Sequence, residues 1–252
     1  MPIILKKPEQ ILLMKEAGRI TGEALLVARD AIRPGISTKE LDTRIHDYIV
    51  RCGATPSFLG YGGFPGSACI SVNDQVIHGI PSKKVILKEG DIVKVDVGAN
   101  YRGFNGDSAK TFAVGTISEA ARRLIEVTRE SFYQGLAFVK VGNRVGDIGY
   151  AISAYAESFG YGVVREYVGH GVGRTLHEEP DVPNYGTQGR GCRLYPGMTI
   201  AIEPMVNEGT AEVKQLSDGW TVVTRDGSLS AHYEHSVAIT EDGPILLTDV
   251  GE

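Results

Sequence analysis

The feature that most restricts the fold is a set of acidic residues inside segments that otherwise have the composition of buried β-strands. Asp96 lies in the apolar run of residues 92–99, and Asp107 lies on the expected returning strand of a β-hairpin. If the hairpin turns near Tyr101 and Arg102, the two aspartates are opposite one another on one face, with Cβ atoms about 5 Å apart. Two carboxylates at that distance repel. Either one is a surface aspartate and the other caps a turn, or a cation lies between them.

Two glutamates favour the cation. Glu203 in AIEP and Glu234 in AHYEHS again place an acid inside a β-like apolar segment. An unpaired buried charge is costly, and divalent cations remove that cost by neutralising neighbouring carboxylates. His170, between glycines in VGHGVG, adds an imidazole. Such an oxygen-rich set favours Mn(II), Fe(II) or Co(II). It has more ligands than one ion needs, which predicts two ions about 3.5–4 Å apart.

Length and charge exclude several classes of protein. The 252 residues are 42% hydrophobic and 23% charged, which suits one globular domain or two fused halves with a sizeable core. The net charge of -5 offers no basic surface of the kind that nucleic-acid binding usually needs. No apolar run approaches the roughly 18 residues of a membrane span, and no signal-peptide pattern is present, so we expect a cytoplasmic protein. Cys52, Cys69 and Cys192 form no close pairs, and we expect free thiols.

Hydrophobic periodicity predicts four helices grouped between β-segments. Residues 8–31 and 38–52 have amphipathic helical spacing, and Ser37 or Thr38 is the expected N-cap of the second helix. Residues 118–139 and 143–159 return to helical spacing. The pattern after residue 162 predicts short strands separated by glycine turns. This order predicts an α+β fold.

The chain also shows an internal similarity at an offset of 107 residues. Residues 87–96 and 194–203 share one pattern, and the same offset superimposes Thr21 on Thr128 and Tyr48 on Tyr155. Identities are few and a glycine-rich chain inflates them, so chance remains an alternative to duplication. Duplication predicts two halves, roughly 21–106 and 128–213, that face each other across a pseudo-twofold axis. Asp96 and Glu203 would then occupy equivalent points in adjacent central strands.

The motifs VDVGANYRGFNGDSAKTF, GHGVG, IEP and EHS, in this order and spacing, resemble those of the methionine aminopeptidases, and HGIP and LHEEP add to the match. The similarity extends over nearly the whole chain. It implies the pita-bread fold, in which two pseudo-symmetric helix-strand halves surround a central antiparallel sheet, with one catalytic domain over residues 1–252. It also implies removal of the N-terminal methionine from nascent proteins and peptides, with preference for a small second residue.

The resemblance further implies a role for each metal ligand. Asp96 would bind one divalent ion, His170 and Glu203 the other, and Asp107 and Glu234 both. A hydroxide between the ions would attack the first peptide bond, and Glu203 would carry the proton.

Two histidines and an apolar slot complete the implied site. His78 and His177 match the family histidines that contact the scissile peptide, although either alone would more often be a hydrogen-bonded loop histidine. The methionine slot is implied to contain Tyr61, Phe64, Cys69 and Trp220, with Leu176 nearby, and each of these could instead simply fill the core.

The sequence departs from the family pattern at three of these places. Phe64 stands where tyrosine is common, Leu176 where phenylalanine is common, and His232 where glutamine is frequent. None of these changes removes a metal ligand, so we expect the enzyme to be active. The shape of the methionine slot, and with it the strength of the preference for methionine, is expected to differ from the family pattern. The family also suggests a monovalent-cation site near Asn73, Gln75 and Ser230.

The short interval between Glu203 and Glu234 leaves no room for the helical insertion of type II enzymes, so the chain resembles the bacterial-style type I form. The implied partners are the N-termini of nascent polypeptides and the ribosome, with no specific nucleic acid and no membrane, and we expect a monomer. Two alternatives remain. One is a proline-specific aminopeptidase or dipeptidase of the same fold, and the other is a metal-free binding protein.

Overall fold

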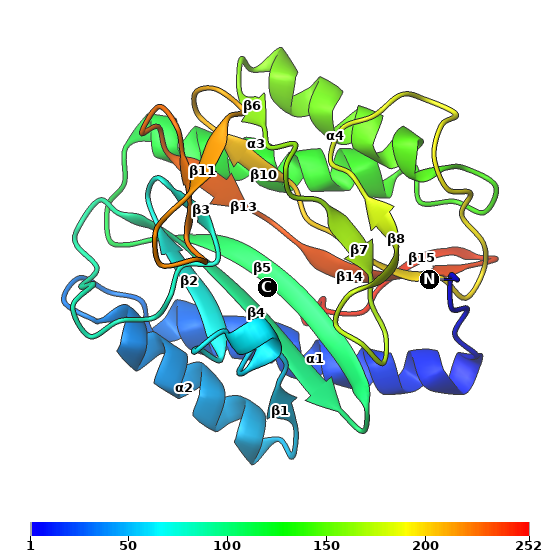
Figure 1. Ribbon diagram of the computed structural model, residues 1–252, viewed down its shortest axis with the longest axis horizontal. Coiled ribbons are helices and arrows are strands. Elements are labelled where there is room, and N and C mark those ends of the chain that lie inside the picture. The colour runs from blue at the N-terminus through cyan, green and yellow to red at the C-terminus, as the bar shows by residue number, and fades with distance from the viewer. Residues whose placement is uncertain (1, 252) are drawn as a thin grey trace.

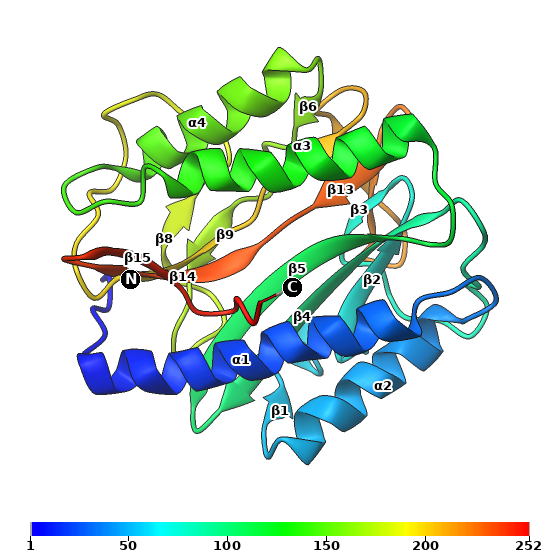
Figure 2. The ribbon, with the colours of Figure 1, turned by 180° about the vertical axis from the view of Figure 1, so that it is seen from behind.

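Four helices cover the outer faces of curved antiparallel strands in the computed structural model, which describes residues 2–251 (Figure 1). Seen from behind, α3 and α4 lie along one side of the strands and α1 and α2 along the other (Figure 2). The helices are α1 (Pro8–Ala31), α2 (Thr38–Arg51), α3 (Glu119–Leu136) and α4 (Val145–Ser158), with a 3-10 turn over Tyr61–Gly63. All four predicted helices are confirmed, with small shifts at their ends.

The strands are short except for one long hairpin. In chain order they are β1 (Thr55–Pro56), β2 (Ala68–Val72), β3 (Gln75–Ile77), β4 (Ile92–Tyr101), β5 (Phe104–Ala113), β6 (Gly162–Val163), β7 (Gly169–Gly171), β8 (Glu178–Val182), β9 (Thr199–Ile202), β10 (Met205–Asn207), β11 (Val213–Gln215), β12 (Val222–Thr224), β13 (Ser230–His232), β14 (His235–Thr240) and β15 (Gly243–Leu246). Among the described residues they form four hydrogen-bonded sheets rather than one, and the pairings are antiparallel. The predicted α+β class is confirmed.

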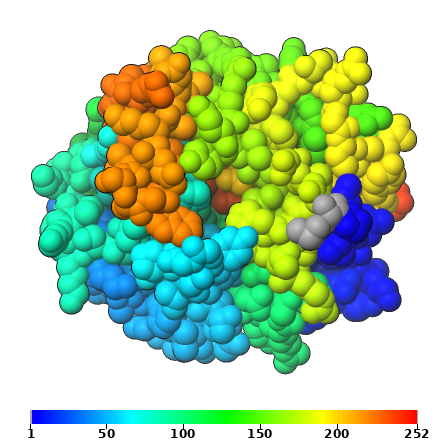
Figure 3. Space-filling view, viewed as in Figure 1, coloured from blue at the N-terminus to red at the C-terminus, as the bar shows by residue number. Residues whose placement is uncertain are grey.

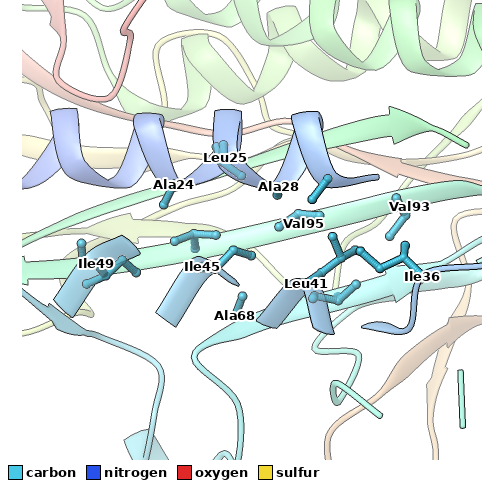
Figure 4. Packing of buried hydrophobic residues seen from close by; sticks show 14 of the residues in the cluster. Ala24, Leu25, Ala28, Ile36, Leu41, Ile45, Ile49, Ala68, Val93 and Val95 are labelled. Atoms are coloured by element: carbon cyan, nitrogen blue, oxygen red, sulfur yellow. The ribbon is translucent and has the colours of Figure 1, made fainter. Parts of the chain in front are cut away.

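Helix α1 packs its apolar face on β4 and β5, and α2 packs beside it on β1 and β2 of the same sheet. Ser37 caps α2 by accepting a hydrogen bond from the Glu40 amide, as the sequence predicts. Behind this cap, buried aliphatic side chains of both helices contact Val93 and Val95 of β4 (Figure 4). Helix α1 approaches β5 so closely that a Cβ built on Gly106 would lie 2.7 Å from the Gly18 Cα. The lower half of the molecule thus holds the hairpin in a fixed position.

The β4–β5 hairpin turns one residue later than the sequence suggested. Arg102 and Gly103 both have positive φ, 50° and 82°, as the type I′ turn requires at its two central positions. This turn pairs Asp96 with Ala109 and Gly98 with Asp107. The prediction that Asp96 and Asp107 are directly opposite is therefore wrong. They are diagonal neighbours, still on one face of the hairpin because the register changes by two.

The two halves of the molecule meet where β5 lies beside β13 and β14. The Glu234 amide donates to the Ala109 carbonyl at 2.8 Å, and the Asp107 amide donates to Ser236 Oγ at 3.0 Å. These bonds place Asp107 and Glu234 together. The expectation that Asp96 and Glu203 occupy adjacent strands is wrong, because β5 and β14 lie between β4 and β9.

Glu203 and Glu234 both lie at breaks in their strands. The pairs Ile202–His235 and Met205–His232 belong to one continuous antiparallel register. Between these pairs the ladder is reduced to one backbone hydrogen bond, from the Tyr233 amide to the Pro204 carbonyl at 3.2 Å. The interruption leaves both glutamates free to project toward the hairpin.

Of the described helices, none has the length and apolar character needed to cross a membrane. Cys52, Cys69 and Cys192 are free thiols, as predicted.

Candidate metal centre

One cavity contains every residue that the sequence suggested for the site. Its lining comprises Phe58, Tyr61, Phe64, Cys69, His78, Asp96, Asp107, His170, Leu176, His177, Glu203, Trp220 and Glu234. In the space-filling view the molecule is hollowed near its centre, between the cyan segment around residue 60, the orange segment near residue 220 and the yellow-green segment near residue 175 (Figure 3). The cavity encloses about 170 Å³. That volume is enough for several water molecules or one side chain.

Acids and imidazoles form two tight groups, and all of their members except His232 line the cavity. Asp107, His170 and Glu234 present ligand atoms within 4.8 Å of one another, and so do Glu203, His232 and Glu234. The groups share Glu234. Asp96 belongs to neither group, although it lines the same cavity.

His170 is oriented as a metal ligand. Its Nδ1 lies 2.8 Å from the Gly171 carbonyl, which can only accept a hydrogen bond, so Nδ1 carries the proton. Nε2 then offers a lone pair toward Asp107 Oδ2 and Glu203 Oε1, each 3.6 Å away. A lone pair facing two carboxylate oxygens is stable when a cation lies between them. A backbone carbonyl that fixes the other ring nitrogen is the usual support of a ligating histidine.

The pKa values of the four carboxyl groups in the cavity are strongly perturbed, although only Asp107 and Glu234 are fully buried and Asp96 and Glu203 are partly buried. Burial raises the pKa of Asp96 to about 7. Burial, reinforced by the neighbouring acids, raises the pKa values of Asp107, Glu203 and Glu234 well above their ordinary range. Asp96 Oδ1 and Asp107 Oδ1 are buried without a hydrogen-bond partner. Desolvated acids with unused oxygens fit divalent cations, which would keep them ionised.

Burial has the opposite effect on the imidazoles. It lowers the pKa of His170 and of His232 to about 3 and that of His78 to about 4, and it also lowers the pKa of His177. The four rings are therefore neutral near pH 7, the form in which histidine binds metals or donates a single hydrogen bond.

The two loop histidines border the same space. His177 lies beside His170, with ring centroids 4.0 Å apart, and its Nδ1 is 2.8 Å from the Tyr61 hydroxyl. If that hydroxyl donates, Nε2 carries the His177 proton and can donate toward the cavity. His78 has a φ of +58°. Its ring lies edge-on to Trp220 at a centroid distance of 6.3 Å.

The apolar side of the cavity is a small separate cluster. Phe58, Phe64, Cys69 and Leu176 are buried together, with Trp220 packed against them. The Phe64 and Trp220 rings meet edge to face at 5.1 Å. Sequence reasoning missed Phe58, because a single aromatic residue in a loop carries no motif. Its place beside Gly98, where a Cβ would lie 2.8 Å from the Phe58 ring, is visible only in three dimensions.

The suggested monovalent-cation position already has a cationic partner. The Asn73 carbonyl accepts hydrogen bonds from the Ser230 amide at 3.1 Å and from Lys94 Nζ at 2.6 Å. Lys94 is only 1% exposed. Gln75 Oε1 accepts instead from the Val72 amide.

Comparison with known proteins decides the family. Residues 12–241 match the model of metallopeptidase family M24. The chain belongs to this family. The chain is 56% identical to a methionine aminopeptidase of Clostridium acetobutylicum, and the match covers 98% of both chains. It is 53% identical to methionine aminopeptidase 1 of Bacillus subtilis, over 98% of this chain and all of the relative.

Solved structures of M24 relatives share the fold. The methionine aminopeptidase of Thermotoga maritima superimposes with a TM-score of 0.97 at 47% identity, over 98% of this chain and all of the other. The prolidase of Pyrococcus furiosus is 26% identical with a TM-score of 0.80, and the match covers 99% of this chain but 66% of the prolidase. The predicted pita-bread fold is confirmed.

Proposed function

We propose that this M24 enzyme removes the N-terminal methionine from peptides and nascent proteins, with preference for a small second residue. The observation that carries the proposal is the single cavity in which the acid and imidazole cluster meets the apolar cluster around Phe64 and Trp220. High identity to methionine aminopeptidases over nearly the full chain supports the same activity.

The acid and imidazole cluster is the proposed holder of two divalent ions, drawn from Mn(II), Fe(II) and Co(II). Asp96 would hold one ion, His170 and Glu203 the other, and Asp107 and Glu234 both. When bound, such ions lower the pKa of a water molecule and polarise the scissile carbonyl. The orphaned carboxylate oxygens and the lone pair of His170 support this assignment.

The protein's own groups would position the peptide and move the proton. Glu203, at the base of the cavity, takes a proton from the attacking water and delivers it to the leaving amine nitrogen. His177 donates from Nε2 to the carbonyl oxygen of the scissile bond, since Tyr61 occupies its Nδ1. His78 approaches the same peptide from the Trp220 side. Neutral donors held in place in this way stabilise a developing oxyanion.

The apolar cluster would bind the methionine side chain. The buried carboxylates lie next to it, so a free amino terminus would meet negative charge at the end of the slot. This arrangement favours exopeptidase action. Phe64 and Leu176, both departures from the common pattern, would set how strictly methionine is selected.

Molecular organisation completes the proposal. We propose one catalytic domain with an internal repeat over roughly 21–106 and 128–213. Helices α2 and α4 support it, because each has 14 residues and they begin 107 positions apart, at Thr38 and Val145. We further propose a monomer in the cytoplasm, where nascent chains and the ribosome would be its partners. A monovalent cation near Asn73 is an additional proposed component, and it would have to share that carbonyl with Lys94.

The test compares peptides on metal-loaded enzyme. Protein freed of metal is loaded with each divalent ion and assayed on Met-Gly-Met and on X-Pro peptides. We expect metal-dependent release of methionine from the first and little hydrolysis of the second. Preferential cleavage of X-Pro bonds would instead favour the prolidase activity of the less similar M24 relatives. Binding of divalent ions without any hydrolysis would favour a binding protein.

A further inference from the structure

His232 is a buried imidazole that the proposed mechanism does not use. Its exposed fraction is 1%, and within residues 2–251 neither Nδ1 nor Nε2 has a hydrogen-bond partner. A buried polar side chain with no partner is costly, and such groups in proteins usually have a specific cause. The backbone of His232 does not explain it, because its amide and carbonyl are satisfied by Thr111 Oγ1, each at 2.9 Å.

The direction of the ring gives a cause. Nε2 lies 3.8 Å from Glu203 Oε2 and 3.9 Å from Glu234 Oε2. These distances are too long for hydrogen bonds. Ligand atoms bound to one ion at about 2.0–2.2 Å each can lie up to about 4.4 Å apart, so His232 Nε2 is close enough to each glutamate oxygen to share an ion with it. Glu203, His232 and Glu234 offer one ligand atom each within 4.8 Å of one another.

His232 and His170 occupy comparable places on the two sides of Glu203. Glu203 Oε1 faces His170 Nε2 at 3.6 Å, and Oε2 faces His232 Nε2 at 3.8 Å. His170 is already expected to be a ligand from its motif. His232, two residues before Glu234 on β13, meets the same carboxylate with nearly the same spacing and is no less buried.

We propose that His232 Nε2 is a direct ligand for a divalent cation, which Glu203 and Glu234 hold with it. The proposal rests on the proposed function only in that the enzyme uses divalent ions. The proposal adds the imidazole of His232 to a ligand set in which the sequence motifs supply a single imidazole, that of His170. The competing role is indirect: after a small movement His232 could donate a hydrogen bond to Glu203 without touching the ion.

The test must count nitrogen ligands, because loss of an indirect hydrogen-bond partner already weakens metal binding by about 10- to 100-fold, and weaker binding alone would not distinguish the two roles. Protein freed of metal is loaded with Mn(II), and pulsed electron paramagnetic resonance measures the histidine nitrogens coupled to the manganese. We expect two coupled imidazoles in the wild type and one in H232Q. Glutamine retains a hydrogen-bonding amide and is frequent at this place in the family pattern. H46Q serves as the control, since His46 lies on α2 and bonds Ser67 outside the cavity.

Equal numbers of coupled imidazoles in the wild type and H232Q would overturn the proposal. Circular dichroism verifies that H232Q is folded. If it is not, nitrogen-15 NMR of wild-type protein titrated with Zn(II) decides, because a ligating His232 must shift its Nε2 resonance on binding. Failure of the shared premise, that the protein binds divalent ions, gives a different result. In that case calorimetry detects no divalent-ion binding by the wild type at all, and no imidazole becomes coupled.

Discussion

Asp96 should destabilise the metal-free protein at neutral pH. Its pKa rises through burial from 3.8 to about 7. Each unit of that difference corresponds to about 1.4 kcal/mol, so an Asp96 carboxylate without a cation lowers the free energy of unfolding by about 4 kcal/mol at pH 8. Between the two pKa values the folded state binds more protons than the unfolded state. The contribution of Asp96 to stability therefore falls as pH rises from about 4 to about 7.

The Asp96→Asn variant isolates this effect. Asparagine resembles the protonated acid in shape and carries no charge, so in EDTA the variant should be more stable than the wild type at pH 8, by up to about 4 kcal/mol or roughly 10 °C in Tm. The difference should vanish near pH 4. Urea and thermal unfolding from pH 4 to pH 8 measure it, with Asp47→Asn, an exposed substitution on α2, as the matched control.

Divalent metal should reduce this difference in stability. At a concentration 100 times its Kd, an ion that binds only the folded state adds about 2.7 kcal/mol, and the variant should lose most of that gain because one ligand is absent. The reasoning is refuted if the metal-free variant is no more stable than the wild type at pH 8. It is also refuted if Mn(II) raises the Tm of both proteins equally.

Three further changes test other parts of the site. His177→Ala should lower kcat for Met-Ala-Ser by about 100- to 1000-fold, as loss of an oxyanion donor does, with little change in KM. An effect on KM alone would show that His177 binds the substrate but does not act in the chemical step. Phe64→Ala should raise KM for methionyl peptides far more than it lowers kcat, because it opens the slot beside Trp220. An unchanged KM would show that the methionine side chain of the substrate does not bind against Phe64. Lys94→Gln should make Tm depend more strongly on KCl relative to choline chloride than wild-type Tm does, since it removes the ammonium that shares the Asn73 carbonyl with the cation; an unchanged salt dependence would argue against a cation at that carbonyl.

The sequence predicted most reliably those features that depend on neighbours in the chain. The helices were recognisable because their apolar spacing and caps are local, as with Ser37 and the Glu40 amide. The register of the hairpin is not predictable in this way, because it depends on whether Arg102 adopts a positive φ. A shift of one residue in the turn moved Asp107 from opposite Asp96 to opposite Gly98.

The site divides in the same way. Residues within recognisable motifs, such as His170 and Glu203, lie in the cavity as the order of the motifs suggested. The positions of Phe58 in the apolar cluster and of His232 facing Glu203 and Glu234 depend on contacts between distant segments, which no local sequence pattern indicates. The placement of Asp96 across two intervening strands from Glu203 likewise follows from how the halves join, which spacing alone does not determine.

That junction links folding to activity. Asp107 lies on β5 and Glu234 beside β14, and these strands make the contact between the halves through the Ala109, Glu234 and Ser236 hydrogen bonds. Mutual repulsion of the two acids therefore acts across the joint itself. Ions bound there would remove the repulsion and connect the halves, so metal binding should raise the cooperativity of unfolding as well as supply the chemistry.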